Sequence, residues 1–209
     1  MPQILKADVR ARILEAALDV FASQGYLGAT IAMIAERAGV GAASLYRYYP
    51  SKGELFDAVI PPELAKRFES LLDRRVRALA QVVLQDVQGN DASDEMFRFW
   101  VENRLAVVVL LDRAAGTAYA HFGERFVEHL VAGTLAQIRA ARPGVRVSAP
   151  ARFVLQRIFE NTRRTLAAIL EEHADERALR EAIDAFWSYQ VPGLRGFART
   201  LTEGVRSKT

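Results

Sequence analysis

The sequence contains no cysteine among its 209 residues. This absence excludes disulfide bonds, thiolate nucleophiles and sulfur-ligated metal centres, and it suits a reducing cytoplasm. Long apolar runs are missing too, since the apolar stretch at residues 106–111 is far shorter than the roughly 20 residues that a membrane-spanning helix needs. The first ten residues lack the apolar core of a signal peptide. We therefore expect a soluble, cytoplasmic protein with no membrane partner.

The chain also has little excess charge of one sign. Its 28 lysines and arginines against 25 acidic residues give a net charge of +3. The excess is not concentrated in the N-terminal quarter of the chain, where basic and acidic residues are almost balanced. Charge alone therefore does not identify a nucleic-acid partner.

Alternation of apolar and polar residues with period two is absent, whereas apolar residues recur at spacings of three and four through most of the chain. This periodicity predicts an all-α fold. Ser51 and Glu54 form a capping box that starts a helix, and Gly25 is suited to end one. The expected helices cover a first segment ending at Gly25, then about 30–38, 42–49, 51–60, 62–87, 94–115, 121–141, 148–173 and 175–201.

The segment from Thr30 to Lys52 has the spacing of a helix-turn-helix motif, at about residues 30–49. Ala35 is small enough for a second helix to cross close by, and Gly39 supplies the positive φ of a tight turn. Such a unit places its second helix in the major groove of DNA. Leu45 and Tyr49 are expected to face inward. The side chains left to contact DNA are Thr30, Ala42, Ala43, Ser44, Tyr46, Arg47, Tyr48 and Lys52.

These side chains can contact DNA in different ways. The planar guanidinium of Arg47 can bond two guanine acceptors at once, so we expect it to read bases. Tyr46, Tyr48 and Lys52 can hold phosphates, and Thr30 caps its helix beside exposed amides that can hold another. The alternative is a plain helical hairpin with an aromatic edge. The sequence Tyr-Arg-Tyr-Tyr at residues 46–49, close to Lys52, favours DNA binding instead.

The N-terminal part of the chain resembles the tetracycline-repressor (TetR) family of regulators. The matching residues are Ile13–Ala17, Phe21, Gly25–Tyr26, Thr30, Ile34–Ala35, Ala38–Val40, Leu45–Tyr46 and Ser51–Leu55. The resemblance implies a three-helix DNA-binding domain, here 1–55, and a larger helical ligand-binding and dimerisation domain, here 56–209. It also implies a repressor released from its operator by a small-molecule inducer.

In that family the residues at the positions of Tyr46 and Lys52 contact phosphate, and those at Ala42, Ser44 and Arg47 lie in the groove. This sequence departs from the family in having Gly41 where a polar residue usually caps the reading helix. The side chains of Ala42 and Ala43 are too short to bond base edges. Base reading is therefore expected to depend on Arg47, Tyr48 and DNA shape.

The C-terminal part is expected to form the dimer through the last two long helices. Each has a broad apolar face, and Gly193 and Gly196 permit close approach of another helix. The alternative is that these faces only complete the core. An apolar or aromatic inducer is expected in a pocket whose polar group is Arg104. The predicted lining is Phe97, Trp100, Arg104, Tyr119, Phe122 and Phe126, for which core packing is again the alternative.

No motif of a nucleophile beside a base, of paired catalytic carboxylates or of a phosphate-binding loop is recognisable, so we expect no enzyme activity and no cofactor. Two further interpretations stay open. One is an α-helical scaffold that does not bind DNA. The other is a metal-responsive regulator, because His121, Glu124, Glu128 and His129 have the spacing of one helical face.

Overall fold

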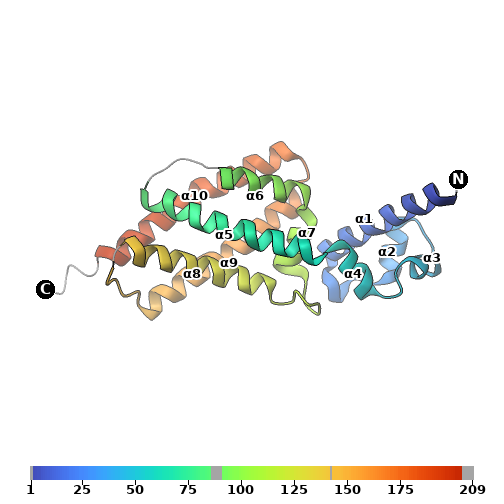
Figure 1. The fold of residues 1–209 in the computed structure, drawn as a ribbon, viewed down its shortest axis with the longest axis horizontal. Coiled ribbons are helices and arrows are strands. Elements are labelled where there is room, and N and C mark those ends of the chain that lie inside the picture. The colour runs from blue at the N-terminus through green and yellow to red at the C-terminus, as the bar shows by residue number, and fades with distance from the viewer. Residues whose placement is uncertain (1, 86–90, 142, 204–209) are drawn as a thin grey trace. The chain divides into compact units, whose positions relative to one another are not determined.

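The computed structural model describes residues 2–85, 91–141 and 143–203. All regular elements within these ranges are helices, which confirms the predicted all-α fold (Figure 1). None of these helices is long and apolar enough to span a bilayer. The chain packs as two compact units: unit 1 combines residues 1–67 with 103–123, and unit 2 combines 68–102 with 124–209. The domain boundary that the sequence places after residue 55 stays a prediction.

Unit 1 holds the N-terminal helices and a later segment of the chain. Its elements are α1 (Pro2–Gly28), α2 (Ile31–Ala38), α3 (Ala42–Tyr48), α4 (Lys52–Val59), the start of α5 (Pro62–Gln85), α7 (Arg104–Val108) and the π-helical turn η1 (Val109–Arg113). Gly25 interrupts α1 with φ +68°, at the position where the sequence predicts a helix end. Ser51 caps α4 by accepting from the amide of Glu54 at 3.1 Å, as the capping box predicts.

The prediction of one helix over about 94–115 is wrong. Asn103 takes a non-helical conformation, with φ −124° and ψ 27°, and separates α6 (Asp91–Glu102) from α7. The apolar residues from Ala106 to Leu111 are all buried, and α7 and η1 pack against α1. The strong apolar character that suggested a buried helix is thus correct, but these residues belong to the core of unit 1.

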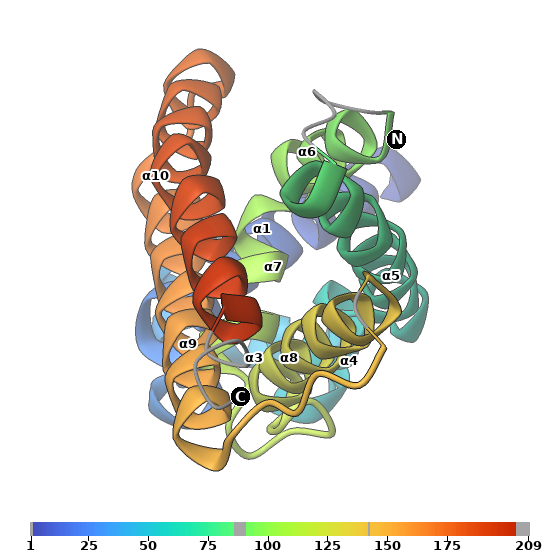
Figure 2. The same ribbon diagram turned by 90° about the vertical axis from the view of Figure 1, so that its left-hand side faces the viewer.

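Unit 2 is built from most of α5 and of α8 (Phe122–Ala141), and from α6, α9 (Ala149–Glu172) and α10 (Glu176–Glu203). Ser148 and Asp175 cap α9 and α10 by accepting from the amides of Ala151 and Ala178. α9 and α10 lie side by side (Figure 2). The α10 helix continues through Pro192, as its apolar pattern predicts.

Two close contacts tie the helices of unit 2 together. The Gln190 amide donates to the Thr162 hydroxyl at 2.9 Å, which joins α10 to α9 through two buried polar groups. Gly133 on α8 lies against the Val76 side chain of α5, where a Cβ would clash. The helices of this unit therefore have little freedom to slide at these points.

Candidate nucleic-acid interface

The turn between α2 and α3 has the geometry that the sequence predicts. The Thr30 hydroxyl caps α2 by accepting from the Met33 amide at 3.2 Å. Gly39 then takes φ +64° and ends the helix, and the next amide, that of Val40, donates to the Ala35 carbonyl at 2.9 Å. α3 begins at Ala42 after Gly41, which offers no side-chain cap. The two helices are thus joined by a short turn with satisfied backbone groups.

The inner face of this motif is closely packed. Ile34, Ala35 and Leu45 are buried, and Tyr49 is only 5% exposed, so the predicted inward orientation of Leu45 and Tyr49 is confirmed. Val40 is half-buried, so it contributes less to this core than Ile34 and Leu45 do. The inner side chains therefore fix the position of α3, and its opposite face stays open.

Arg10 is a residue of this site that sequence reasoning did not select. Its Nε donates to the Tyr49 hydroxyl at 3.1 Å, which links α1 to the end of α3. This hydrogen bond, together with the charge interaction with Tyr49, raises the pKa of Arg10 above its ordinary value. The two residues are far apart in the sequence, so no local spacing could have revealed the contact.

The outer face of α3 carries the predicted DNA contacts. Ala42, Ala43, Tyr46 and Arg47 are exposed. Arg47 donates from Nη2 to the Ser44 hydroxyl at 3.0 Å, which uses one of its five N–H groups. Small side chains therefore lie at the start of the helix, and an arginine with free donors lies near its end. Thr30 is also exposed, while Ser44 and Tyr48 are half-buried. Their contacts with DNA stay predictions.

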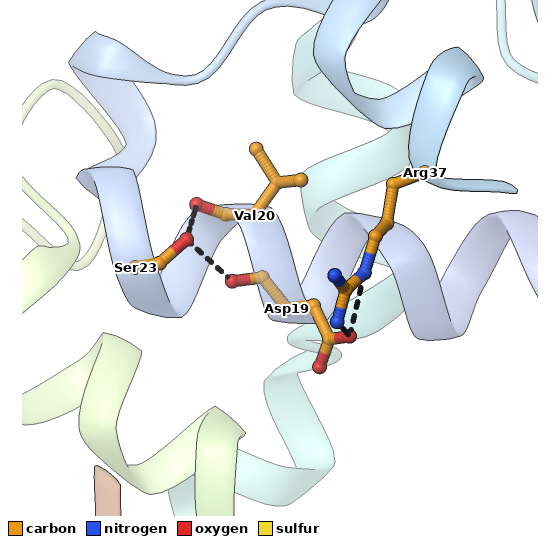
Figure 3. Close-up of polar contacts among 4 residues, drawn as sticks. All are labelled: Asp19, Val20, Ser23 and Arg37. Atoms are coloured by element: carbon orange, nitrogen blue, oxygen red, sulfur yellow. Dashed lines mark hydrogen bonds and ion pairs between the residues drawn. The ribbon is translucent and has the colours of Figure 1, made fainter.

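An ion pair holds α2 against α1 beside this face. Arg37, in the last turn of α2, donates from Nη2 and Nε to the same carboxylate oxygen of Asp19, at 2.8 and 3.2 Å (Figure 3). The Ser23 hydroxyl donates to the carbonyls of Asp19 and Val20 one turn further along α1. Because the Arg37 charge is paired, it is a weaker candidate for phosphate than its exposure alone suggests.

Lys52 has a structural role in addition to its predicted phosphate contact. Its Nζ donates to the carbonyls of Tyr26 and Ala29, at 2.7 and 2.9 Å, and lies 4.4 Å from the centre of the Tyr26 ring. These carbonyls lie at the end of α1, where helical backbone acceptors lack intrahelical partners. Two of the three ammonium donors are therefore used within the protein, and one remains for DNA.

Replacing Lys52 with methionine is expected to lower the free energy of unfolding by about 1–3 kcal/mol, because two charge-assisted hydrogen bonds are lost while the apolar stem is kept. If the third donor holds a phosphate, the slope of log affinity against log salt also flattens by roughly two units in a dimer. Urea titrations and DNA titrations at several salt concentrations measure both effects.

Lys66→Met is the matched control, since Lys66 is exposed in the same unit. It should leave stability unchanged. A Lys52→Met protein that is as stable as the unmodified chain would contradict the role at the end of α1. An unchanged salt slope would remove Lys52 from the phosphate contacts.

The six predicted pocket residues do not fall in one unit. Phe97, Trp100 and Phe126 are buried in unit 2, where Phe126 packs on Phe68 with ring centres 6.0 Å apart. Arg104, Tyr119 and Phe122 belong to unit 1. Tyr119 packs there against Phe56 and Phe122, in an aromatic cluster that also includes Phe21 and Tyr26. A pocket lined by all six stays a prediction.

One of the four residues proposed for a metal site, His129, has a partner on another helix. It pairs through Nε2 with Asp73 of α5 at 2.7 Å. His121 lies before the start of α8, while Glu124, Glu128 and His129 lie within it. Within the described ranges, no group of three or more acidic, histidine or cysteine side chains has an arrangement that could hold a metal ion. The structure thus gives the metal-responsive alternative no ligand set.

Comparison with known proteins gives matches to bacterial regulators. Residues 13–59 match the family model described as bacterial regulatory proteins, tetR family. The transcriptional repressor KstR of Mycolicibacterium smegmatis is 38% identical over 69 residues, which is 33% of this chain and 33% of that protein. The repressor AcnR of Corynebacterium jeikeium is 31% identical over 97 residues, 45% of this chain and 50% of that protein.

Further matches include a protein with another role and a solved structure. The nucleoid occlusion factor SlmA of Alteromonas mediterranea is 38% identical over 60 residues, 29% of this chain and 31% of that protein. The chain thus spans about a fifth to a half of the curated relatives that it matches. A crystal structure of a tetR-family regulator from Streptomyces coelicolor, 19% identical, aligns with 94% of this chain and 89% of its own, with a TM-score of 0.38.

Proposed function

We propose that the chain is a sequence-specific DNA-binding transcriptional repressor of the tetR family of bacterial regulatory proteins, since residues 13–59 match that family's model and the repressors KstR and AcnR are similar to it. It acts as a homodimer and leaves its operator when a small apolar or aromatic molecule binds to the C-terminal helices. Its role is binding and not catalysis, and it acts in the cytoplasm, where bacterial DNA lies. Residues 1–55 carry the DNA contacts, and the rest of the chain carries the dimer contact and the effector site.

The observation that supports this function most is the free outer face of α3. Its inner face is fixed by Leu45 and Tyr49, so the helix is presented in one orientation. Ala42 and Ala43 at its start let the backbone approach the base edges, and Arg47 extends from its last turn with free donors. A rigid helix with small residues at the front and an arginine behind fits a major groove about 12 Å wide.

The dimer contact is proposed on α9 and α10. Large apolar side chains stay exposed there: Phe153 is 60% exposed on α9, and Tyr189 is 77% exposed on α10. Tyr189, Gly193 and Gly196 follow one another at helical spacings of four and three, and a Cβ at either glycine would meet no atom within 4 Å. A second copy is the occupant of this face, because one helix-turn-helix makes too few contacts for a selective site.

In vitro selection from a pool of random DNA duplexes tests the function. We expect the selected sequences to converge on an inverted repeat whose half-sites lie about 10–10.5 base pairs apart, centre to centre, or a multiple of that distance. Ala43→Asp should abolish selection, because it places a carboxylate on the exposed front of α3.

Ala58→Asp is the matched control, because Ala58 is exposed on α4 and has no predicted DNA contact. It should select the same sequences as the unmodified chain. A pool that shows no enrichment with the unmodified protein would instead favour the scaffold interpretation.

A further inference from the structure

Arg75 on α5 is a charged residue of unit 2 that the proposed DNA contacts do not use. Its side chain is half-buried, and this partial burial lowers the pKa of Arg75 from its ordinary value. The guanidinium carbon lies 5.3 Å from the centre of the Trp187 ring on α10. Arg75 has no hydrogen bond or ion pair with any residue that the structure describes. An arginine keeps its charge inside proteins, so this half-buried positive charge has no counter-ion among the described residues.

The acidic side chains near Arg75 in the sequence have other partners. Arg74, the next residue, is exposed and pairs with Glu95 at 2.7 Å. Glu69 and Asp73 of the same helix face α8, where they pair with Arg125 and His129. Arg74, Arg125 and His129 are thus paired with carboxylates. The half-buried Arg75 has no such partner among the described residues. Stacking on an aromatic ring offsets only part of the cost of removing a guanidinium from water.

A buried donor of unit 2 also lacks an acceptor. Trp100 on α6 is 5% exposed, and its Nε1 has no hydrogen-bond partner among the described residues. Arg180 on α10 lies over the Phe97 ring of the same α6 helix, with its guanidinium carbon 3.9 Å from the ring centre. The helices α5, α6 and α10 therefore carry aromatic faces, and Arg75 and Trp100 each lack a hydrogen-bond acceptor among the described residues.

We infer that unit 2 binds an amphipathic oxyanion, with its carboxylate or phosphate head group on the guanidinium of Arg75 and its apolar body among the aromatic side chains of α6 and α10. A guanidinium stacked on a ring keeps its N–H edges available for two parallel bonds to an oxyanion. This inference rests on the proposed function, because it gives the chemical class of the effector. It assigns to Arg75 the polar role that the sequence suggested for Arg104.

Thermal shift and calorimetric titration test the inference with a matched set of probes. The oxyanions are hexanoate, decanoate, phenylbutyrate and decyl phosphate, and the neutral controls are hexanol, decanol and phenylbutanol. We expect at least one oxyanion to raise the Tm of the unmodified protein more than the alcohol with the same body. Arg75→Met should weaken binding of that probe by at least about tenfold, as expected for loss of a charge-assisted bidentate contact.

Arg77→Met, at an exposed position of the same helix, should keep the binding of the unmodified protein. A response to decyl phosphate alone, or to the carboxylates alone, would identify the head group. Equal binding by Arg75→Met and the unmodified protein would overturn the inference. So would equal shifts with oxyanions and alcohols, or no shift with any probe.

The ligand-free protein gives a second test that does not depend on the probe. Removing a half-buried charge that has no counter-ion among the described residues, while keeping an apolar stem, should raise the Tm of Arg75→Met, whereas Arg77→Met should not change it. A lower Tm for Arg75→Met would mean that the fold already satisfies the guanidinium, and would contradict the inference. Selective DNA binding without oxyanion binding would refute this inference alone, and oxyanion binding without DNA binding would refute the repressor function alone.

Discussion

Replacing Arg47 with alanine is expected to reduce the ratio of operator affinity to scrambled-DNA affinity by at least about thirtyfold. A bidentate arginine contact to guanine discriminates against a wrong base by about 1–3 kcal/mol, and a dimer loses two such contacts. Arg47 is exposed, and its bond to the Ser44 hydroxyl leaves most of its donors free. Binding to scrambled DNA should change much less, because contacts to phosphates carry no sequence information.

Fluorescence-anisotropy titrations on the selected operator and on a scrambled duplex, at one fixed salt concentration, measure this ratio. Arg37→Ala is the matched control, since it also removes one arginine from the same motif, but one that is paired with Asp19. It should leave the ratio unchanged. If Arg47→Ala kept the full ratio, base reading would have to come from Tyr48 or from DNA shape.

Replacing Gly193 with arginine is expected to convert the dimer into a monomer and to lower operator affinity by at least about a hundredfold. Within one protomer a Cβ at this exposed position meets no atom within 4 Å, so the fold should be kept. At the proposed interface it places a charge where two α10 helices approach closely. A monomer also loses the gain in affinity that comes from binding two half-sites together.

Sedimentation velocity at micromolar concentration measures the oligomeric state, and operator titrations measure the affinity. Asp184→Arg is the control. It adds an arginine at an exposed position of α10 two and a half turns away, hence on the opposite side of the helix. That variant should stay dimeric. A Gly193→Arg protein that also stays dimeric would show that the two copies meet through another surface.

The helix-turn-helix was predictable because the contacts that shape it are local. Thr30 caps the amide three residues later, Gly39 ends its own helix, and the spacing of Ala35, Gly39 and Leu45 follows from the turn. The contacts of Lys52 and Arg10 join residues 23 to 39 positions apart, and no sequence period encodes such distances. Local patterns thus predicted the helices of the site, but not the bonds that hold these helices to α1.

The effector region was less predictable for a related reason. Helical periodicity continues through residues 94–115, so nothing in the pattern showed that the chain breaks at Asn103 and changes unit there. An arginine also looks the same in a sequence whether it is exposed and paired, as Arg74 is, or half-buried and without a counter-ion among the described residues, as Arg75 is. Which one lacks a partner depends on how α5 turns against its neighbours, and only the folded chain shows that.

The composition of unit 1 from two separate stretches affects both its synthesis and its use in engineering. A ribosome completes residues 1–67 first and must then make the whole of 68–102 before the apolar stretch from Ala106 to Leu111 can pack against α1. Until then, the nascent helices expose the surface that this stretch covers. A chimaera made by grafting residues 1–55 onto a foreign domain would inherit that uncovered surface permanently, so a transferable DNA-reading module of this protein has to carry residues 103–123 as well.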